Sequence, residues 1–450
     1  MDDKQPVDET VIDIRTVCQK VLEDNWRTTH TIPAENLYPH QWLWDSCFIA
    51  IGLRHVDVAK AQQEIRSLLR GQWSNGMLPH MIFADEGPAS KDRRIWQAWR
   101  NPHAPDDINT SGMTQPPMLA EAVIKIGEKL SEPEKRKWYQ DMYPSLLSHH
   151  EWLYRERDPH NEGLVSLIHP WESGLDNSPP WINQLHMHSR SWWITVVEKL
   201  KLDRLILLVR RDTHHVPPGQ RLNSIDALLY YTVLQRLRRK NWDTEAILER
   251  SHFMIEDLAF NSILLRANKY LQDIAQIAGK TLPEEMIENV NKSELAIEKL
   301  WDGYHKQYFS RSFITHKLIK EPSIGALLPL YAGVISKERA EELVDMLHDK
   351  KLFDTPYPIA SVPLESSYYK ELGYWQGPSW INTNWLIADG LERYGFKDEA
   401  ATIANQSIAM VQKNGSYEYF SAKNGDPAGA KNFSWTAALI IDFIETSSSN

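Results

Sequence analysis

Apolar residues recur every three or four positions along most of this chain, the period that places side chains on one face of an α-helix. Near the start, Val11, Ile14, Cys18 and Leu22 follow this pattern. Further helices are predicted at about 58–70, 118–129, 142–157, 223–238, 253–277, 284–300, 337–348, 380–394, 397–412 and 434–446. Alternating strand patterns are scarce by comparison, so the chain is predicted to be all-α.

Long connections rich in Pro, Gly, His and Trp separate these helices, at 27–45, 71–117, 159–192, 210–222, 351–378 and 414–433. Such long loops are usually functional or disordered, and their aromatic content indicates order. About a dozen helices with functional loops at one end predict an (α/α)6 barrel; an irregular helical array or an α-solenoid would give a similar pattern, although no fixed-period repeat is present. We expect residues 1–450 to form a single domain, with loops 71–117 and 205–222 as a cap over the site.

Composition and charge disfavour several classes of binding partner. The net charge of −10, with both signs mixed along the chain, disfavours nucleic acid, which needs clustered Lys and Arg. No run of 18 or more apolar residues occurs and the N-terminus is polar, so neither a membrane nor a leader is expected. The two cysteines, Cys18 and Cys47, are too few for a disulfide framework and have no zinc-type spacing. A cytoplasmic chain without metal or cofactor is predicted, and a homo-oligomer is compatible with it.

The 18 tryptophans exceed ordinary usage and indicate carbohydrate contact, although about half are expected simply to fill the core. Two carboxyl groups stand among such aromatics. Asp176 follows Trp171 in a Gly- and Pro-rich run that disfavours a helix, where indole burial would raise its pKa and keep it protonated. Glu172 is its competitor, and a structural Asp-Asn-Ser turn is the alternative. Glu418 lies in a short extended segment, interpreted as a loop at the barrel mouth or as a surface hairpin.

Two further clusters combine aromatic rings with amides and one carboxylate, groups that stack on sugars and bond to their hydroxyls. The first, 38–48, ends at the start of a helix where Asp45 is either a hydroxyl acceptor or a helix cap. The second, 373–385, surrounds a Gly-Pro turn. The candidates for sugar contact from these clusters are Tyr38, Trp42, Trp44, Asp45, Tyr374, Trp375, Gln376 and Trp380.

Six runs carry a resemblance that spans nearly the whole chain: QWLWDSCF, GMLPHM, ESGLDNSP, Asp257-Leu-Ala-Phe-Asn261, YWQGPSW and YEYF. Together they resemble glycoside hydrolase family 63, most closely its compact glucosylglycerate and mannosylglycerate hydrolases. The resemblance implies an (α/α)6 barrel and an inverting reaction, with Asp176 as general acid and Glu418 as general base. It also implies that Gln115 joins the sugar pocket. Many relatives have Arg where this chain has Gln376.

A glycerate glycoside carries a carboxylate, which a guanidinium binds through two parallel hydrogen bonds. Within the loop segment 209–218, Arg211 is the candidate, with Arg210 as its alternative, and both are equally compatible with surface charges. The hypothesis is an inverting α-glycosidase that releases hexose and glycerate. It requires the carboxyl groups of Asp176 and Glu418 to lie roughly 6.5–9.5 Å apart, whereas about 5 Å would indicate retention.

Other functions remain open at this level. Trehalase-like hydrolysis of another small α-glucoside would use the same acid and base. Sugar epimerases and polysaccharide lyases also use helical barrels, the former with paired histidines. The histidines available for that chemistry are His80, His103, His214 and His215.

Overall fold

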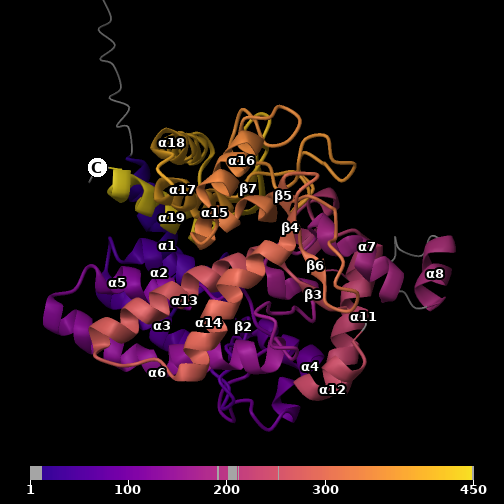
Figure 1. Ribbon diagram of the computed structural model, residues 1–450, viewed down its shortest axis with the longest axis horizontal. Helices are drawn as coiled ribbons and strands as arrows, with labels where there is room; N and C mark the ends of the chain where they lie inside the picture. Colours follow the sequence, from indigo (N-terminus) through magenta and orange to yellow (C-terminus); the bar gives the residue numbers. More distant parts are fainter. Residues whose placement is uncertain (1–12, 190–191, 201–209, 211, 252, 448–450) are drawn as a thin grey trace, which may run out of the picture.

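The computed structural model describes residues 13–189, 192–200, 210, 212–251 and 253–447 (Figure 1). Within that part, six helices form an inner ring, and each packs on the next until α19 returns to α2. Their bounds are α2 Leu43–Leu53, α5 Leu119–Gly127, α13 Leu258–Ala278, α15 Pro329–Ala332, α17 Ile381–Arg393 and α19 Ser434–Ser447. A closed ring of this kind excludes the open array and the solenoid.

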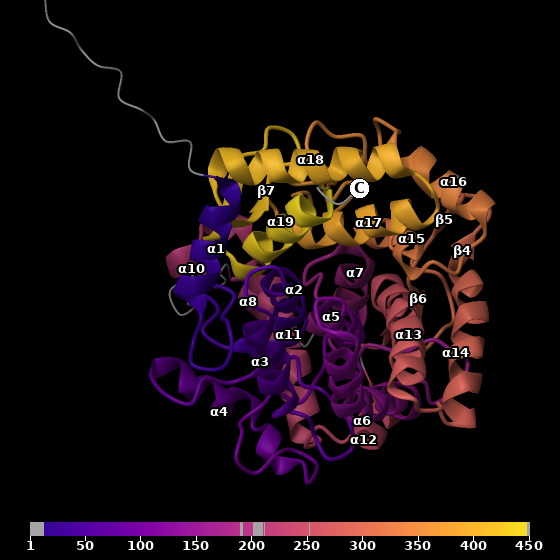
Figure 2. The same ribbon diagram turned by 90° about the vertical axis from the view of Figure 1, so that its left-hand side faces the viewer.

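Six outer helices surround this ring, and each packs on inner neighbours. They are α1 Ile14–Asn25, α3 Val58–Leu69, α6 Glu132–Arg157, α14 Glu284–Ala296, α16 Lys337–Leu347 and α18 Lys397–Asn414. Figure 2 shows α18 lying over α17 and α19, and α14 lying outside α13. The described chain is therefore an (α/α)6 barrel, as the sequence predicted.

Inner and outer helices differ in how much of their surface is buried, and their sequences explain the difference. Every residue of α2 is buried, as are ten consecutive residues of α19 from Ser434 to Phe443. Both sequences are apolar all round, which is what a helix surrounded by other helices requires. The outer helices α1, α3 and α16 bury only one stripe and begin at Asp13, Asp57 and Ser336, whose side chains accept from the first-turn amides.

Several helix bounds differ from the sequence prediction. α6 begins ten residues earlier than expected, at a capping box formed by Ser131 and Glu134, and continues through Pro144. α13 begins at Leu258 because Asp257 caps it, and the residues before it are extended. The segment 159–192 was predicted to be a connection, yet α7 (Pro179–His188) starts there because two prolines suit a first helical turn.

The remaining helices flank the barrel beside α7: α4 Arg93–Trp96, α8 Trp192–Lys199, α10 Asp212–His215, α11 Ser224–Arg239 and α12 Thr244–Glu249. Short 3-10 turns, η1 Pro88–Asp92, η2 Ala98–Arg100, η3 Pro170–Ser173, η4 Pro218–Gln220, η5 Ile297–Leu300 and η6 Ile324–Leu327, occur in the connections. None of the helices in the described ranges is both long and apolar enough to cross a membrane.

Four antiparallel ribbons of two short strands complete the described chain. They are β1 Gln41–Trp42 with β2 Met81–Ile82, β3 Ile255–Glu256 with β6 Arg311–Ser312, β4 Trp301–Asp302 with β5 Gln307–Tyr308, and β7 Tyr417–Phe420 with β8 Pro427–Lys431. The candidate residues Tyr38, Gln115 and Tyr374 lie in the connections just ahead of α2, α5 and α17, and Glu418 lies in the β7–β8 hairpin that leads into α19. The site therefore forms where the inner helices begin.

Candidate active site

Asp176 lies in the turn between η3 and α7, and its backbone is fixed from two sides. Its carbonyl accepts from the Trp181 indole at 2.8 Å and from the Tyr230 hydroxyl. Its carboxyl accepts one hydrogen bond, from the Tyr374 hydroxyl to Oδ2 at 2.8 Å. Burial raises the pKa of Asp176 to about 7, and repulsion by Glu418 adds to this, against the opposing effects of Tyr374 and Arg221. Such a carboxyl can hold a proton at neutral pH.

Glu172, the competing acid, is a structural residue. Its oxygens accept from both terminal nitrogens of Arg157, at 2.9 Å each. The backbone amides of Thr114 and Ile168 donate to it at 3.2 and 2.8 Å. With these four donors and no exposed surface, Glu172 ties η3 to α6 and has no oxygen left for a substrate.

Glu418 lies on β7 and points inward, with only 1% of its surface exposed. Oε1 accepts from the Tyr38 hydroxyl at 2.7 Å, and Oε2 accepts from the Ala430 amide of β8 at 2.9 Å. Gly429, at φ 73°, lies so close that a Cβ there would meet Oε2 at 2.5 Å, which explains the glycine. The segment is thus a hairpin, but a buried one, because Phe420 also pairs with Ser379 ahead of α17.

Arg221 is the functional candidate that sequence reasoning missed. Its terminal nitrogens donate to both oxygens of Glu418, at 3.0 and 2.6 Å. Its guanidinium lies over the rings of Tyr38 and Tyr374, at 5.6 and 5.0 Å from their centroids. Arg221 therefore links the residue that bonds Glu418 to the residue that bonds Asp176. The available signal was a third arginine in the predicted cap loop, two residues before the helix cap Asn223.

Asp45, at the first turn of α2, adds a third carboxyl group to this cluster. It is 5% exposed, and no side chain of the described residues donates a hydrogen bond to it. Burial raises its pKa well above the usual value, and both Glu418 and Asp176 contribute by repulsion. Trp42 Nε1 and Arg221 Nε are also buried, and neither has a hydrogen-bond partner among the described residues. Polar groups left unpaired in this way are what a bound polyol would satisfy.

The other predicted aromatic contacts lie one layer deeper. Trp375 and Trp380 stack on each other, with ring centroids 3.7 Å apart, and each is 1% exposed. Trp380 also packs on Tyr374, and Trp44 packs between Trp375 and Trp435. Among the predicted aromatic residues, Tyr38 and Tyr374 bond to the carboxyl groups, and Trp42 packs edge-on against Tyr38. Tyr374 has φ 65°, an uncommon conformation for a non-glycine residue that is often found at functional sites.

Two predicted polar contacts brace the walls of the site. Gln376 Nε2 donates to the carbonyl of Asn177 at 2.8 Å, which fixes the turn that carries Asp176. Gln115 Oε1 accepts from the Trp44 amide at 3.5 Å. A cavity of about 420 Å³ opens beside Gln376 between α7 and α11. Its lining includes neither Asp176 nor Glu418, so this cavity adjoins the carboxyl cluster rather than containing it.

The structure describes one of the two arginines that were predicted to bind a carboxylate, Arg210. Arg211 lies outside the described residues. The Arg210 guanidinium pairs with Asp212, with Nε to Oδ1 at 3.0 Å, and donates to the Leu222 carbonyl at 2.6 Å. Arg210 thus holds its own segment together. At the end of that segment, the Gln220 carbonyl accepts from the Tyr419 hydroxyl at 2.6 Å, against the β7–β8 hairpin.

The histidines that an epimerase would need do not join the carboxyl groups. His80 is buried against Trp42 and bonds Ser111, and burial lowers its pKa well below the usual value. His103 bonds Ser74, while His214 and His215 are exposed on α10. Across the described part of the chain, none of the hydrogen-bond partners of Asp176 and Glu418 is a histidine.

Known proteins resemble this chain in sequence and in fold over nearly its whole length. The model of the "mannosylglycerate hydrolase MGH1-like glycoside hydrolase domain" matches residues 38–436. Mannosylglycerate hydrolase of Thermus thermophilus is 36% identical, over 94% of this chain and 98% of its own. Glucosylglycerate hydrolase of Mycolicibacterium hassiacum is 28% identical, over 94% and 96%. A crystal structure of a GH63 mannosylglycerate hydrolase from T. thermophilus, with Tris and D-glycerate, matches with TM-score 0.86 and 36% identity, over 96% and 100% of the chains.

A closed (α/α)6 barrel with buried carboxyl groups where its inner helices begin thus has the fold of a glycoside hydrolase. The family-model match over residues 38–436 defines the family more closely than the fold does. The chain belongs to the MGH1-like glycoside hydrolases of family 63.

Proposed function

We propose that the protein is an inverting α-glycosidase that hydrolyses a small glycerate glycoside, glucosylglycerate or mannosylglycerate, to hexose and glycerate. Asp176 donates its proton to the glycosidic oxygen, and Glu418 accepts a proton from the attacking water on the opposite face of the sugar. The observation that carries the proposal is the contrast between the surroundings of the two carboxyl groups. Asp176 accepts from the Tyr374 hydroxyl and has a pKa raised to about 7, so it can hold a proton to donate. Glu418 accepts hydrogen bonds from Arg221, from the Tyr38 hydroxyl and from the Ala430 amide.

The remaining polar groups fit the sugar. Asp45 offers two adjacent hydroxyls a carboxyl group to which no side chain of the described residues donates, and Trp42 offers an indole N–H that has no partner among those residues. Burial raises the pKa of Tyr38 and of Tyr374 well above 10, so both hydroxyls stay protonated and act as hydrogen-bond donors. We assign substrate contact to Tyr38, Trp42, Asp45 and Tyr374. Trp44, Gln115, Trp375, Gln376 and Trp380 shape and support the same pocket.

The position of Arg221 supports a substrate whose leaving group carries a carboxylate. A carboxylate accepts about four hydrogen bonds, and Glu418 already has four donors. A water molecule therefore needs one of them to move. The Ala430 amide belongs to the hairpin backbone, whereas Arg221 is a side chain that the carboxylate of glycerate can attract. We propose Arg221 as a guanidinium for the glycerate group in place of Arg210, which is paired with Asp212. Arg211, which lies outside the described residues, stays a proposed partner of the same group.

The location and the cap are part of the same proposal. Cys18 and Cys47 are both buried free thiols, which supports a reducing compartment such as the cytoplasm. Segments 71–117 and 205–222 act as a cap that closes on a small substrate and excludes water. Equal protection of both segments from hydrogen exchange with and without substrate would contradict the cap.

The experiment is a substrate panel for the purified protein: glucosylglycerate, mannosylglycerate, glucosylglycerol, trehalose and kojibiose, with released hexose measured. We expect one of the two glycerate glycosides to be hydrolysed with the highest kcat/KM. Preference for trehalose or kojibiose would instead indicate a trehalase-like enzyme with the same acid and base. Release of no hexose from any of the five would contradict the proposal.

A further inference from the structure

Two histidines and one glutamate meet on the surface, outside the carboxyl cluster. His160 and Glu162 lie in the turn after α6, and His316 lies in the turn after β6. One ligand atom of each residue lies within 4.8 Å of the others, and the two histidines are exposed. Imidazole nitrogens and a carboxylate oxygen are a ligand set that zinc binds. No local pattern along the chain predicts this cluster, because more than 150 residues separate Glu162 from His316.

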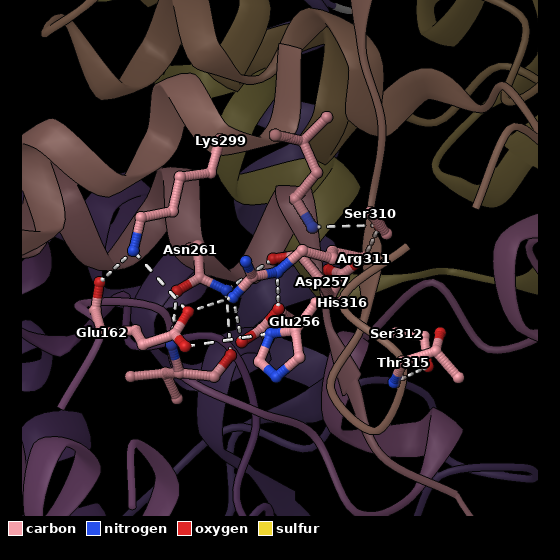
Figure 3. Close-up of polar contacts among 12 residues, drawn as sticks. Glu162, Glu256, Asp257, Asn261, Lys299, Ser310, Arg311, Ser312, Thr315 and His316 are labelled. Carbon is pink, nitrogen blue, oxygen red and sulfur yellow. Dashed lines mark hydrogen bonds and ion pairs between the residues drawn. The ribbon is translucent and has the colours of Figure 1, made fainter. Parts of the chain in front are cut away.

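Glu162 is already oriented by a second layer of residues. Its Oε2 accepts from Arg311 Nη2 at 2.7 Å and lies 3.6 Å from Lys299 Nζ. Its Oε1 lies on the other side, 3.9 Å from His316 Nδ1. Arg311 is held in turn by Glu256, with Nη2 to Oε1 at 2.7 Å. Figure 3 shows Glu162 surrounded by Lys299, Arg311 and His316. Metal-binding carboxylates are typically held by such outer hydrogen bonds.

The neighbouring charges leave room for a cation. Arg311 and Lys299 carry two positive charges, and Glu162 and Glu256 carry two negative ones. Asp158, which accepts from the amides of Glu162 and Gly163 at 2.9 and 2.7 Å, adds a third carboxylate. Lys292 Nζ donates to Asn161 Oδ1 at 3.0 Å, between two of the ligands, and adds a third positive charge. Formally the surroundings are therefore neutral before a metal binds, so a cation meets no net positive charge there.

The two imidazoles are also held in place. The His160 ring stacks on Phe313, with centroids 4.7 Å apart, and lies 6.0 Å from the His316 ring at an angle of 30°. His316 has φ 53°, and its amide donates to the Ser312 carbonyl at 2.8 Å. Ligand atoms on one tetrahedral zinc lie about 3.3 Å apart, since each bond is about 2.0–2.1 Å long. The three ligand atoms already lie within 4.8 Å of one another, so a bound ion needs to draw them together only slightly.

We propose that His160, Glu162 and His316 bind one divalent transition-metal ion, for which zinc is the best chemical match. The two nitrogen ligands favour zinc over magnesium, which prefers oxygen. The ion joins the turn after α6 to the β3–β6 ribbon. β3 also bridges to Leu167, at the start of the segment that leads to Asp176. The expected effect is therefore on the stability of this segment, and the chemistry does not use the metal.

The test is a calorimetric titration of the full-length, tag-free protein with zinc chloride after treatment with a chelator. We expect one zinc per chain, a higher Tm with zinc, and no comparable effect of magnesium. His160→Ala and His316→Ala should each weaken zinc binding by at least about 10-fold. Both side chains are exposed, so the variants should fold, and circular dichroism checks this.

His348→Ala is the matched control, because His348 is an exposed histidine outside the proposed site, with Nε2 at 3.6 Å from Glu399. It should bind zinc like the wild type. The proposal is overturned if the double variant His160→Ala/His316→Ala binds zinc as tightly as the wild type, or if the wild type binds none.

Discussion

Two buried arginine–glutamate pairs make this barrel instructive, because the same chemistry has different surroundings in each. Glu172 pairs with Arg157, and its other two donors are backbone amides. Glu418 pairs with Arg221, but one of its other donors is the hydroxyl of Tyr38, and a carboxyl with a raised pKa lies nearby. Arg157 also belongs to a long helix, whereas Arg221 belongs to a connection. The first pair stabilises the fold, while the second can exchange partners with a ligand.

The largest expected effect comes from removing the acid or the base. Asp176→Asn and Glu418→Gln should each lower kcat by about 10²–10⁴-fold, because proton transfer in the transition state is lost. Asp176→Asn keeps the shape of the side chain and removes neither partner of the Arg221–Glu418 pair, so its Tm should change little. Glu418→Gln also keeps the shape but leaves Arg221 buried without its anion, so its Tm should fall. Steady-state kinetics and thermal unfolding of the two variants check this. A variant that retains more than a tenth of wild-type kcat would remove that residue from the mechanism.

The matching change at the structural pair should lower stability but leave kcat nearly unchanged. Glu172→Gln leaves Arg157 buried without its anion, which costs about 3–5 kcal/mol of unfolding free energy. The kcat of the fraction that remains folded should stay within about threefold of the wild type. Urea unfolding and active-site titration measure the two quantities. If kcat collapsed while stability held, Glu172 would be the acid in place of Asp176.

A smaller effect is expected at the exchangeable pair. Arg221→Lys keeps the positive charge but loses the planar, two-pronged contact with a carboxylate. We expect the kcat/KM ratio between the preferred glycerate glycoside and uncharged glucosylglycerol to fall by about 10-fold. Arg210→Lys is the control and should leave this ratio unchanged. An equal loss on both substrates would mean that Arg221 serves only to hold Glu418.

The pH profile tests the raised pKa of Asp176. The acid must carry its proton, and burial places its pKa at about 7, so kcat/KM should fall as pH rises through about 7. The slope above that point should approach tenfold per pH unit. Asp176→Asn should lose this basic limb in its residual activity. A wild-type profile that stays flat from pH 6 to 9 would contradict Asp176 as the acid.

The smallest effect is expected at the support for Asp176. Gln376→Ala removes the hydrogen bond to the Asn177 carbonyl, worth about 1 kcal/mol, or about fivefold in rate if it acts only on the transition state. kcat should therefore fall by about fivefold, with KM less affected. Gln376→Glu keeps an acceptor but loses the donor and should not restore kcat. An increase in KM alone would indicate direct contact with the sugar.

The helical period was sufficient to predict the barrel, because both rings are built from local patterns of three and four residues. It failed where local chemistry overrides the period, as at the capping box of Ser131 and Glu134 and at the prolines that begin α7. For the site, the aromatic surroundings singled out Asp176 and Glu418. The roles of Glu172 and Arg221 depend on partners far apart in the chain, which no local pattern contains.

The most direct test of the acid–base pair is the anomeric form of the first product. Proton NMR of the hydrolysis of the preferred α-glycoside, recorded before mutarotation, resolves the two anomers of the released hexose. An acid at Asp176 and a base at Glu418 that activates water on the opposite face predict the β-anomer first. Initial release of the α-anomer would show retention and would contradict the account.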